Sequence, residues 1–290
     1  MGLDQKTGVE RPVIQMTQGL ATSDGAGVKL TRVMGSGDLD MLDPFLLFDV
    51  FRSDEAQDYI AGFPPHPHRG FETVTYLLNG RMRHQDSKGH NGVIEAGGIQ
   101  WMTAARGIVH SEMPEQEDGL LEGFQLWVNL PRELKMTEPR YQEFPRSSIP
   151  IEQRQDGVEI SVIAGQTSLG TSSPIRNVFT EPVFLDVRLG GKGGFVEAVP
   201  DSHNAFVYVI DGSFQVLGEK SSEDQTLQAR TLAVLGNGDR VQIIGQNPRN
   251  RLLLIAGKRL NEPVVRGGPF VMNTKAEVLQ AFKDYERGEL

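Results

Sequence analysis

A short turn signature occurs twice in this chain and constrains the fold more than any other feature. Tyr76-Leu77-Leu78-Asn79-Gly80 and Tyr208-Val209-Ile210-Asp211-Gly212 match position by position, with an aromatic residue, two aliphatic residues and a turn dipeptide. Asn-Gly and Asp-Gly after alternating apolar residues are strong signals for a β-hairpin. The repeat predicts two copies of one all-β unit, each of the jelly-roll kind.

The rest of the chain agrees with an all-β reading until its end. Glycine occurs 33 times and proline 16 times without a period, as expected for many short strands joined by turns. Near the C-terminus, Thr274 and Glu277 have the spacing of a capping box. Apolar residues then recur at helical intervals. We therefore expect one short C-terminal α-helix over residues 274–287.

Prolines suggest where the two units are joined. Positions 131, 139, 145 and 150 are all proline, and charged side chains surround them. Such a segment is typical of an extended linker. We expect an N-terminal barrel over 1–130, a linker over 131–150, and a C-terminal barrel over 151–290 that ends in the helix.

Composition excludes several function classes. The formal net charge of −9 argues against direct binding of nucleic acid, which depends on neutralising phosphates with basic side chains. The absence of cysteine excludes disulfides, thiolate nucleophiles and cysteine-ligated metals. The first residues lack the apolar core of a secretory signal, and no apolar run is long enough to cross a membrane. We expect a cytoplasmic protein, or also a nuclear one in a eukaryote, without membrane contact.

Two distant segments each carry a pair of potential metal ligands separated by one residue. His66 and His68 form the first pair, and His110 and Glu112 form the second. Residues i and i+2 of a strand point to the same face. A lone His-x-His is more often structural, but a second pair with the same spacing favours a shared site. If the two strands face each other, three imidazoles and one carboxylate converge on a metal, which we interpret as iron.

The segments around these pairs resemble those of a known family. Residues 66–74 read His-Pro-His-Arg-Gly-Phe-Glu-Thr-Val and resemble the first cupin motif of the pirin family. Residues 100–114 resemble the second motif, and 262–274 resemble the closing segment. The resemblance spans nearly the whole chain. It implies a bicupin, with two tandem cupin-type β-barrels and one metal in the N-terminal barrel on His66, His68, His110 and Glu112.

The first motif departs from the general cupin pattern, in which its glutamate binds the metal. The resemblance implies that Glu112 takes this role and that Glu72 supports the site from outside. Glu72 nevertheless has the same parity as His68, so it remains the rival of Glu112. We expect His84 and His90 at the surface or rim of a hairpin, and His203 in a second barrel without metal.

The resemblance implies a quercetin 2,3-dioxygenase, which cleaves flavonols with dioxygen and releases carbon monoxide. Its cofactor would be Fe(2+), although Ni, Cu, Co and Mn suit the same donors. Glu112 would be the catalytic base that takes the proton of the flavonol 3-hydroxyl. The nearby Phe63, Phe71, Trp101 and Met102 would line either the pocket or the barrel core.

A second hypothesis is a non-enzymatic regulator. The resemblance also implies an iron- or redox-sensing transcriptional cofactor that acts through a protein partner, in addition to or instead of catalysis. For either function we expect a monomer.

Overall fold

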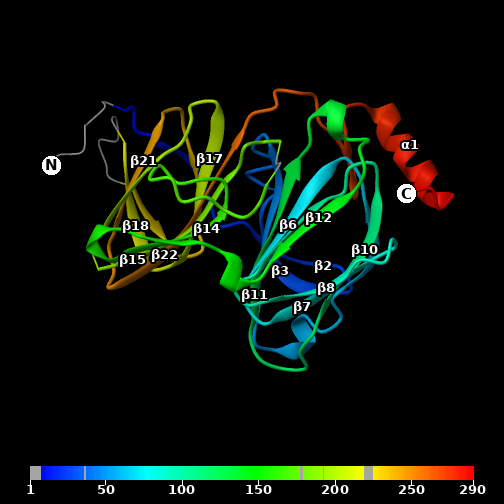
Figure 1. Cartoon of the computed structure of the whole chain (residues 1–290), viewed down its shortest axis with the longest axis horizontal. Coiled ribbons are helices and arrows are strands. Elements are labelled where there is room, and N and C mark those ends of the chain that lie inside the picture. The colour runs from blue at the N-terminus through cyan, green and yellow to red at the C-terminus, as the bar shows by residue number, and fades with distance from the viewer. Residues whose placement is uncertain (1–7, 36, 177–178, 192, 219–224) are drawn as a thin grey trace. The chain divides into compact units, whose positions relative to one another are not determined.

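The computed structural model describes residues 8–35, 37–176, 179–191, 193–218 and 225–290. Residues 1–7 lie outside this set. They belong to the N-terminal segment in which no secretory signal is expected. The described residues are mostly β-strand, with a single α-helix, α1 (Lys275–Glu286) (Figure 1). This confirms the predicted all-β class with a short C-terminal helix.

Two compact units make up the chain. The unit formed mainly by the N-terminal half also contains the C-terminal segment, and the other unit also contains the N-terminal segment. Residues 19–148 and 260–290 form one unit, which we call the N-terminal barrel. Residues 1–18 and 149–259 form the other, which we call the C-terminal barrel. The units therefore do not follow the predicted boundaries at 130 and 151.

The N-terminal barrel consists of two antiparallel sheets. A core that includes Phe51, Leu77 and Met82 joins residues of both sheets. The larger sheet has the order β12-β9-β6-β11-β4-β3-β2 and the smaller one the order β5-β10-β7-β8. The bounds are β2 (Leu20–Asp24), β3 (Val28–Met34), β4 (Phe45–Ser53), β5 (Phe63–His68), β6 (Phe71–Asn79), β7 (Arg81–Asp86), β8 (Asn91–Glu95), β9 (Ile99–Thr103), β10 (Ile108–Pro114), β11 (Leu121–Asn129) and β12 (Arg140–Phe144).

The C-terminal barrel repeats this arrangement of seven and four strands. Its sheets have the orders β1-β20-β17-β22-β15-β14-β13 and β16-β21-β18-β19. Aliphatic side chains such as Val162, Leu185 and Leu254 fill the space inside. The bounds are β1 (Val13–Thr17), β13 (Ile151–Gln153), β14 (Val158–Ala164), β15 (Val183–Gly190), β16 (Gly194–Ala198), β17 (His203–Asp211), β18 (Ser213–Leu217), β19 (Gln225–Gln228), β20 (Leu232–Leu235), β21 (Arg240–Gly245) and β22 (Arg249–Lys258).

The two turn signatures lie at equivalent corners of the two barrels, but neither forms a hairpin. β6 and β7 belong to different sheets, and so do β17 and β18. Gly80 and Gly212 are the single connecting residues, with φ of 88° and 78°. A β-carbon at Gly212 would lie 2.6 Å from the carbonyl oxygen of Arg249. Each glycine therefore turns the chain from one sheet into the other, so the duplication was predicted correctly and the local pairing was not.

The segment predicted as a linker is part of the N-terminal barrel. β12 pairs with β9 at the edge of the larger sheet. Pro139 and Pro145 flank β12 without interrupting it. Proline is tolerated at the ends of edge strands because no ladder hydrogen bond is lost there. The proline pattern was therefore misread as a linker.

The predicted C-terminal helix is present, but it packs on the N-terminal barrel. The backbone N–H of Glu277 donates to Thr274 Oγ1 at 3.2 Å, as expected for the capping box. Phe282 contacts Phe270 of β24 (Phe270–Met272), which pairs with β23 (Val265–Gly267). The assignment of this helix to the second barrel was wrong, because helical periodicity does not indicate the surface on which a helix packs.

A buried lysine holds the closing segment against the N-terminal barrel. Lys135 Nζ donates to the carbonyl oxygen of Gly70 at 2.6 Å, to Asn129 Oδ1 at 2.5 Å and to the carbonyl oxygen of Val271 at 3.0 Å. These three contacts use all three donors of the ammonium group. One side chain thus connects the start of β6, the end of β11 and β24.

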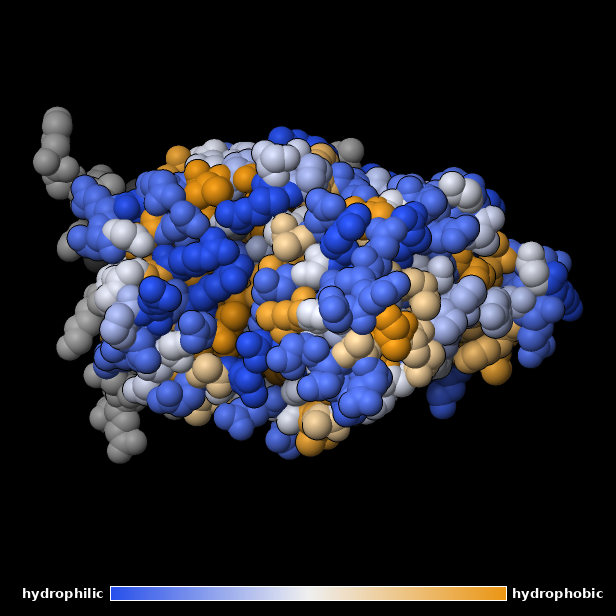
Figure 2. All heavy atoms as spheres, turned by 90° about the horizontal axis from the view of Figure 1, so that it is seen from below, coloured by the Kyte–Doolittle hydropathy of each residue, from blue (hydrophilic) through white to orange (hydrophobic). Residues whose placement is uncertain are grey.

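The surface has no large apolar area on the face shown in Figure 2, where hydrophobic residues form small separate groups among hydrophilic ones. Scattered apolar residues of this kind are normal on protein surfaces. Within the described residues, no helix has the length and apolarity that crossing a membrane requires.

We predict that Lys135→Met destabilises the protein by about 3 kcal/mol or more, because it leaves three buried acceptors without a donor. Urea denaturation, followed by circular dichroism, measures this loss. Lys88→Met, at an exposed turn, is the matched control and should unfold like the wild type. A Lys135→Met protein as stable as the wild type would contradict the structural role of this ammonium group.

Candidate metal centre

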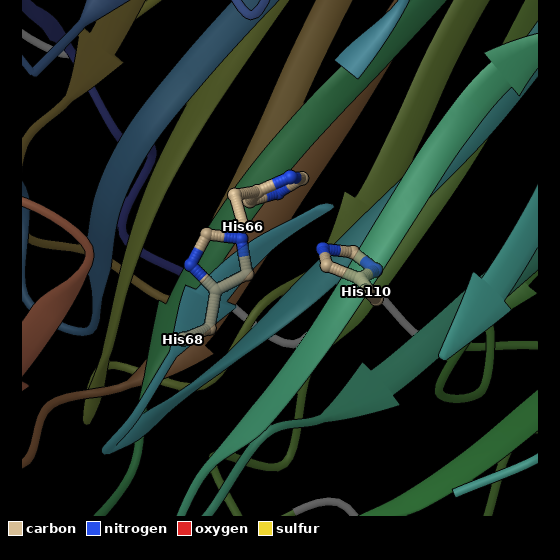
Figure 3. A group of neighbouring side chains, drawn as sticks. All are labelled: His66, His68 and His110. Carbon is tan, nitrogen blue, oxygen red and sulfur yellow. The ribbon is translucent and has the colours of Figure 1, made fainter. Parts of the chain in front are cut away.

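Three imidazoles meet where β5 and β10 pair. The two strands are antiparallel, with His110 directly opposite His66. The side chains of His66 and His68 point to the same side as that of His110 (Figure 3). One donor atom from each of the three residues lies within 4.8 Å of the others. The predicted convergence of these histidines from two distant segments is therefore present.

The prolines of β5 fit its position at the edge of the smaller sheet. An edge strand has one side free of ladder hydrogen bonds, where a residue without an N–H is tolerated. Pro65 and Pro67 also fix φ on both sides of His66. The Nδ1 atom of His66 lies 2.8 Å from the carbonyl oxygen of Pro64. If Nδ1 carries the proton in that contact, Nε2 is left as the metal donor.

The chemistry of these histidines suits a transition metal. Within the described part of the chain, His68 Nδ1 and both ring nitrogens of His110 are buried without a hydrogen-bond partner. Buried polar atoms are normally bonded, so such nitrogens suggest a ligand. Burial lowers the pKa of all three histidines, and those of His68 and His110 fall well below the usual value. The rings are therefore neutral, which is the form that binds metals.

Glu112 lies beside this group but not within it. Its carboxylate is outside the set of donors that lie within 4.8 Å of one another. It lines the same cavity as His66 and His68, and Thr75 Oγ1 lies 3.1 Å from its Oε1 atom. Burial raises the pKa of Glu112 to about 7. Its role as the fourth ligand remains a prediction.

The rival carboxylate points elsewhere. Glu72 and Thr75 are three residues apart on β6, so their side chains lie on opposite faces of the strand. Thr75 faces Glu112, whereas Glu72 Oε1 accepts a hydrogen bond from Thr103 Oγ1 at 2.6 Å. Side chains alternate between faces only within one strand. Glu72 does not share the face of His68, because β5 ends at His68 and the chain turns at Gly70, with φ of 91°, before β6 begins.

His84 was expected at the surface or rim, and that prediction was wrong. Its side chain is buried, because β7 lies inside the smaller sheet and places it opposite Glu112 of β10. His84 Nδ1 lies 3.4 Å from Glu112 Oε1, and burial lowers its pKa to about 3. His84 therefore packs against the candidate site as a neutral imidazole.

The remaining two histidines have other environments. His90 is half-buried and stacks on Tyr141, with ring centroids 4.2 Å apart. In the C-terminal barrel, His203 Nε2 lies 2.8 Å from the carbonyl oxygen of Glu181, and Nδ1 lies 3.1 Å from Ser202 Oγ. Both ring nitrogens of His203 thus have hydrogen-bond partners, as expected for a structural histidine.

A cavity of about 640 Å³ adjoins the imidazoles. Of the four apolar residues considered for its wall, Phe63 lines it, and Phe71 touches the His68 ring with centroids 5.1 Å apart. Trp101 and Met102 are instead buried core residues that do not line it. Sequence reasoning missed the lining residues Trp127 and Arg266, although Arg266 lies in the closing segment that the resemblance singled out.

We predict that Glu72→Gln changes the pH dependence of stability. Burial raises the pKa of Glu72 from 4.5 to about 7, so the folded protein holds this proton more tightly than the unfolded chain. Its contribution to the unfolding free energy is therefore lost as the pH rises from about 4.5 to about 7, and it stays lost above that. Glutamine keeps the acceptor for Thr103 but cannot ionise.

Relative to the wild type, Glu72→Gln should therefore be more stable at pH 8 than it is at pH 4.5. Urea denaturation of the two metal-free proteins at both pH values measures the difference. The exposed Glu138→Gln is the control and should show no such change. The same stability difference at both pH values would show that Glu72 ionises normally in the folded protein.

Comparison with known proteins assigns the family. The Pirin family model matches residues 27–128, and the model of the pirin C-terminal cupin domain matches residues 184–290. A pirin-like protein of Caulobacter vibrioides is 50% identical over 278 residues, which cover 96% of this chain and 98% of that protein. Pirin of Homo sapiens is 43% identical over 269 residues, or 92% of this chain and 89% of that protein.

A solved structure shows the same fold. The crystal structure of quercetin 2,3-dioxygenase from Acinetobacter baumannii is similar to this chain with a TM-score of 0.86 and 32% identity, covering 97% of this chain and 98% of that one. The two family models cover most of both barrels, and the C-terminal model also includes residues 260–290, which pack with the N-terminal barrel. This chain therefore belongs to the pirin family and is a bicupin.

Proposed function

We propose that this protein is a metal-dependent dioxygenase that cleaves flavonols of the quercetin type and releases carbon monoxide. The observation that carries the proposal is a group of neutral imidazoles, His66, His68 and His110, that opens into a cavity with a carboxyl group beside it. The similarity to quercetin 2,3-dioxygenase from Acinetobacter baumannii supports the same reaction.

The cofactor we propose is Fe(2+), held by the three histidines and Glu112. When bound, it supplies the redox chemistry through which dioxygen reacts with an organic substrate. Nickel, copper, cobalt and manganese also bind nitrogen and oxygen donors, so metal content is measured together with activity.

Glu112 is the proposed base for the flavonol 3-hydroxyl. In the metal-free protein, burial raises the pKa of Glu112 to about 7, a range in which a carboxyl group can both accept and return a proton near neutral pH. Thr75 Oγ1 lies 3.1 Å from Glu112 Oε1 and 2.7 Å from Gln125 Oε1. A hydroxyl has only one proton, so Thr75 can donate either to Glu112 or to Gln125. Donation to Glu112 favours its ionised form, which is the form that a base requires.

The cavity has the dimensions and the polarity of a site for a small aromatic molecule. Its volume of about 640 Å³ lies within the range of ligand pockets, roughly 300–1,000 Å³. Phe51, Phe63 and Trp127 provide apolar surface for aromatic rings, and the imidazoles and Glu112 supply the polar groups. The proposed partners are therefore a flavonol and dioxygen.

We predict that the iron-loaded protein consumes oxygen with quercetin and releases carbon monoxide. Glu112→Gln should reduce the rate about 100-fold or more, as expected for loss of a general base. His110→Ala should lose both metal and activity. His90→Asn is the matched control, because it changes a histidine outside the imidazole group and should keep the metal and the rate. An oxygen electrode, a carbon monoxide assay and elemental analysis provide the measurements.

A fully iron-loaded protein that neither consumes oxygen nor releases carbon monoxide would overturn this proposal. It would favour the second candidate, a redox-sensing regulator that acts through a protein partner. One contact favours that candidate specifically. Arg69 directly follows His68, and its Nη1 atom donates to Asp284 Oδ2 of α1 at 2.6 Å. A change of charge at the metal would then act on α1 through the neighbouring Arg69 and its ion pair with Asp284.

A further inference from the structure

One cationic side chain on the cavity wall has no polar partner. Two arginines, Arg32 and Arg266, line the cavity. Arg32 donates to both carboxylate oxygens of Asp49, at 2.9 and 2.7 Å, and to Asp24 at 2.7 Å. Among the described residues, Arg266 forms neither a hydrogen bond nor an ion pair through its side chain. Arg266 is exposed to solvent, so its guanidinium group is available to water or to a ligand that enters the cavity.

An aromatic ring holds this guanidinium beside the candidate metal centre. The Cζ atom of Arg266 lies over the Trp127 ring, 4.8 Å from its centroid. The same ring packs against Phe71 at 4.4 Å and against the imidazole of His68 at 5.1 Å. A cation–π contact positions a guanidinium without using its N–H groups, so all five donors remain free.

The nearby acidic residues do not account for Arg266. Asp24 and Asp49 already accept hydrogen bonds from Arg32. Asp49, Asp40 and Asp24 all lie near enough to favour the charged form of Arg266, but none of these described carboxylates forms an ion pair with it. The cavity is therefore lined both by a cation with free donors and by the imidazoles of His66 and His68.

We propose that Arg266 determines specificity by binding an anionic oxygen of the substrate. This inference rests on the proposed function for the metal-binding end of the ligand. It extends that function by naming the substrate class, which is a planar aromatic molecule with metal-binding oxygens at one end and a carboxylate or an ionised phenol at the other. Arginine is suited to this role because its planar donors match the two oxygens of a carboxylate and can also donate to the single oxygen of a phenolate.

The test compares ligands that differ only in charge. The zinc-loaded protein binds each ligand without turnover, and isothermal titration calorimetry measures the dissociation constants. The first pair is the 4′-carboxamide of 3-hydroxyflavone and the corresponding 4′-carboxylate. The second is 3,4-dihydroxybenzamide and 3,4-dihydroxybenzoate, which needs no flavonol site. Quercetin carries phenols but no carboxylate. Its binding below and above the pH at which its phenols ionise shows whether Arg266 also recognises a phenolate.

We predict that Arg266→Met weakens binding of each carboxylate about tenfold or more and changes binding of its neutral partner by less than twofold. The size follows from the loss of a charge-assisted hydrogen bond. Arg266→Lys should recover part of the preference, because it keeps the charge. Arg52→Met, in β4 and outside the cavity lining, is the matched control.

An equal loss for both members of each pair would overturn the inference, because Arg266 would then act only by packing on Trp127. A wild-type protein that binds the neutral ligands as tightly as the anionic ones, or that binds neither, would also overturn it. Failure of the proposed function would give a different result. The protein would then not consume oxygen with quercetin, but it would still prefer the anionic ligands.

Discussion

The antiparallel pairing of β5 with β10 is the interaction on which the candidate site depends. It places His110 directly opposite His66, so that two segments more than 40 residues apart contribute rings to one point. β5 is an edge strand and tolerates the prolines that stiffen it around His66. A shift of this pairing by one residue would turn one histidine away from the others.

Burial gives these side chains their chemistry. The imidazoles are neutral because the barrel excludes water from them, and the same exclusion raises the pKa of Glu112 toward neutrality. Neutral imidazoles are the form that binds a metal, and a carboxyl group with a pKa near 7 can accept and return a proton. The proposed reaction uses both properties. Arg266 differs from them, since it reaches the cavity from β23 and keeps its charge beside Trp127.

Sequence reasoning predicted what strand periodicity alone determines. Parity within one strand correctly placed His66 with His68, and the repeated turn signature correctly indicated two similar all-β units. Parity failed for Glu72 because Gly70 separates two strands, and a left-handed glycine resets the side-chain direction. The hairpin prediction failed at Gly80 for a related reason, since one glycine passes the chain between sheets where a two-residue turn would have paired neighbouring strands.

Other features depend on long-range packing that a single sequence does not display. The exchange of terminal segments between the two units, the burial of His84 and the approach of Arg266 to Trp127 all bring together residues that are distant along the chain. Lys135 illustrates the difficulty, because a lysine among charged residues reads as solvent-exposed until its three buried acceptors are known.

The central claim is that side chains from two distant strands hold one metal ion inside the N-terminal barrel. Anomalous-difference maps from crystals of the iron-loaded protein, collected above and below the iron absorption edge, test it most directly. The account predicts a single strong peak about 2.1 Å from ring nitrogens of His66, His68 and His110. A map without density between these rings, or with its peak elsewhere in the molecule, would contradict it.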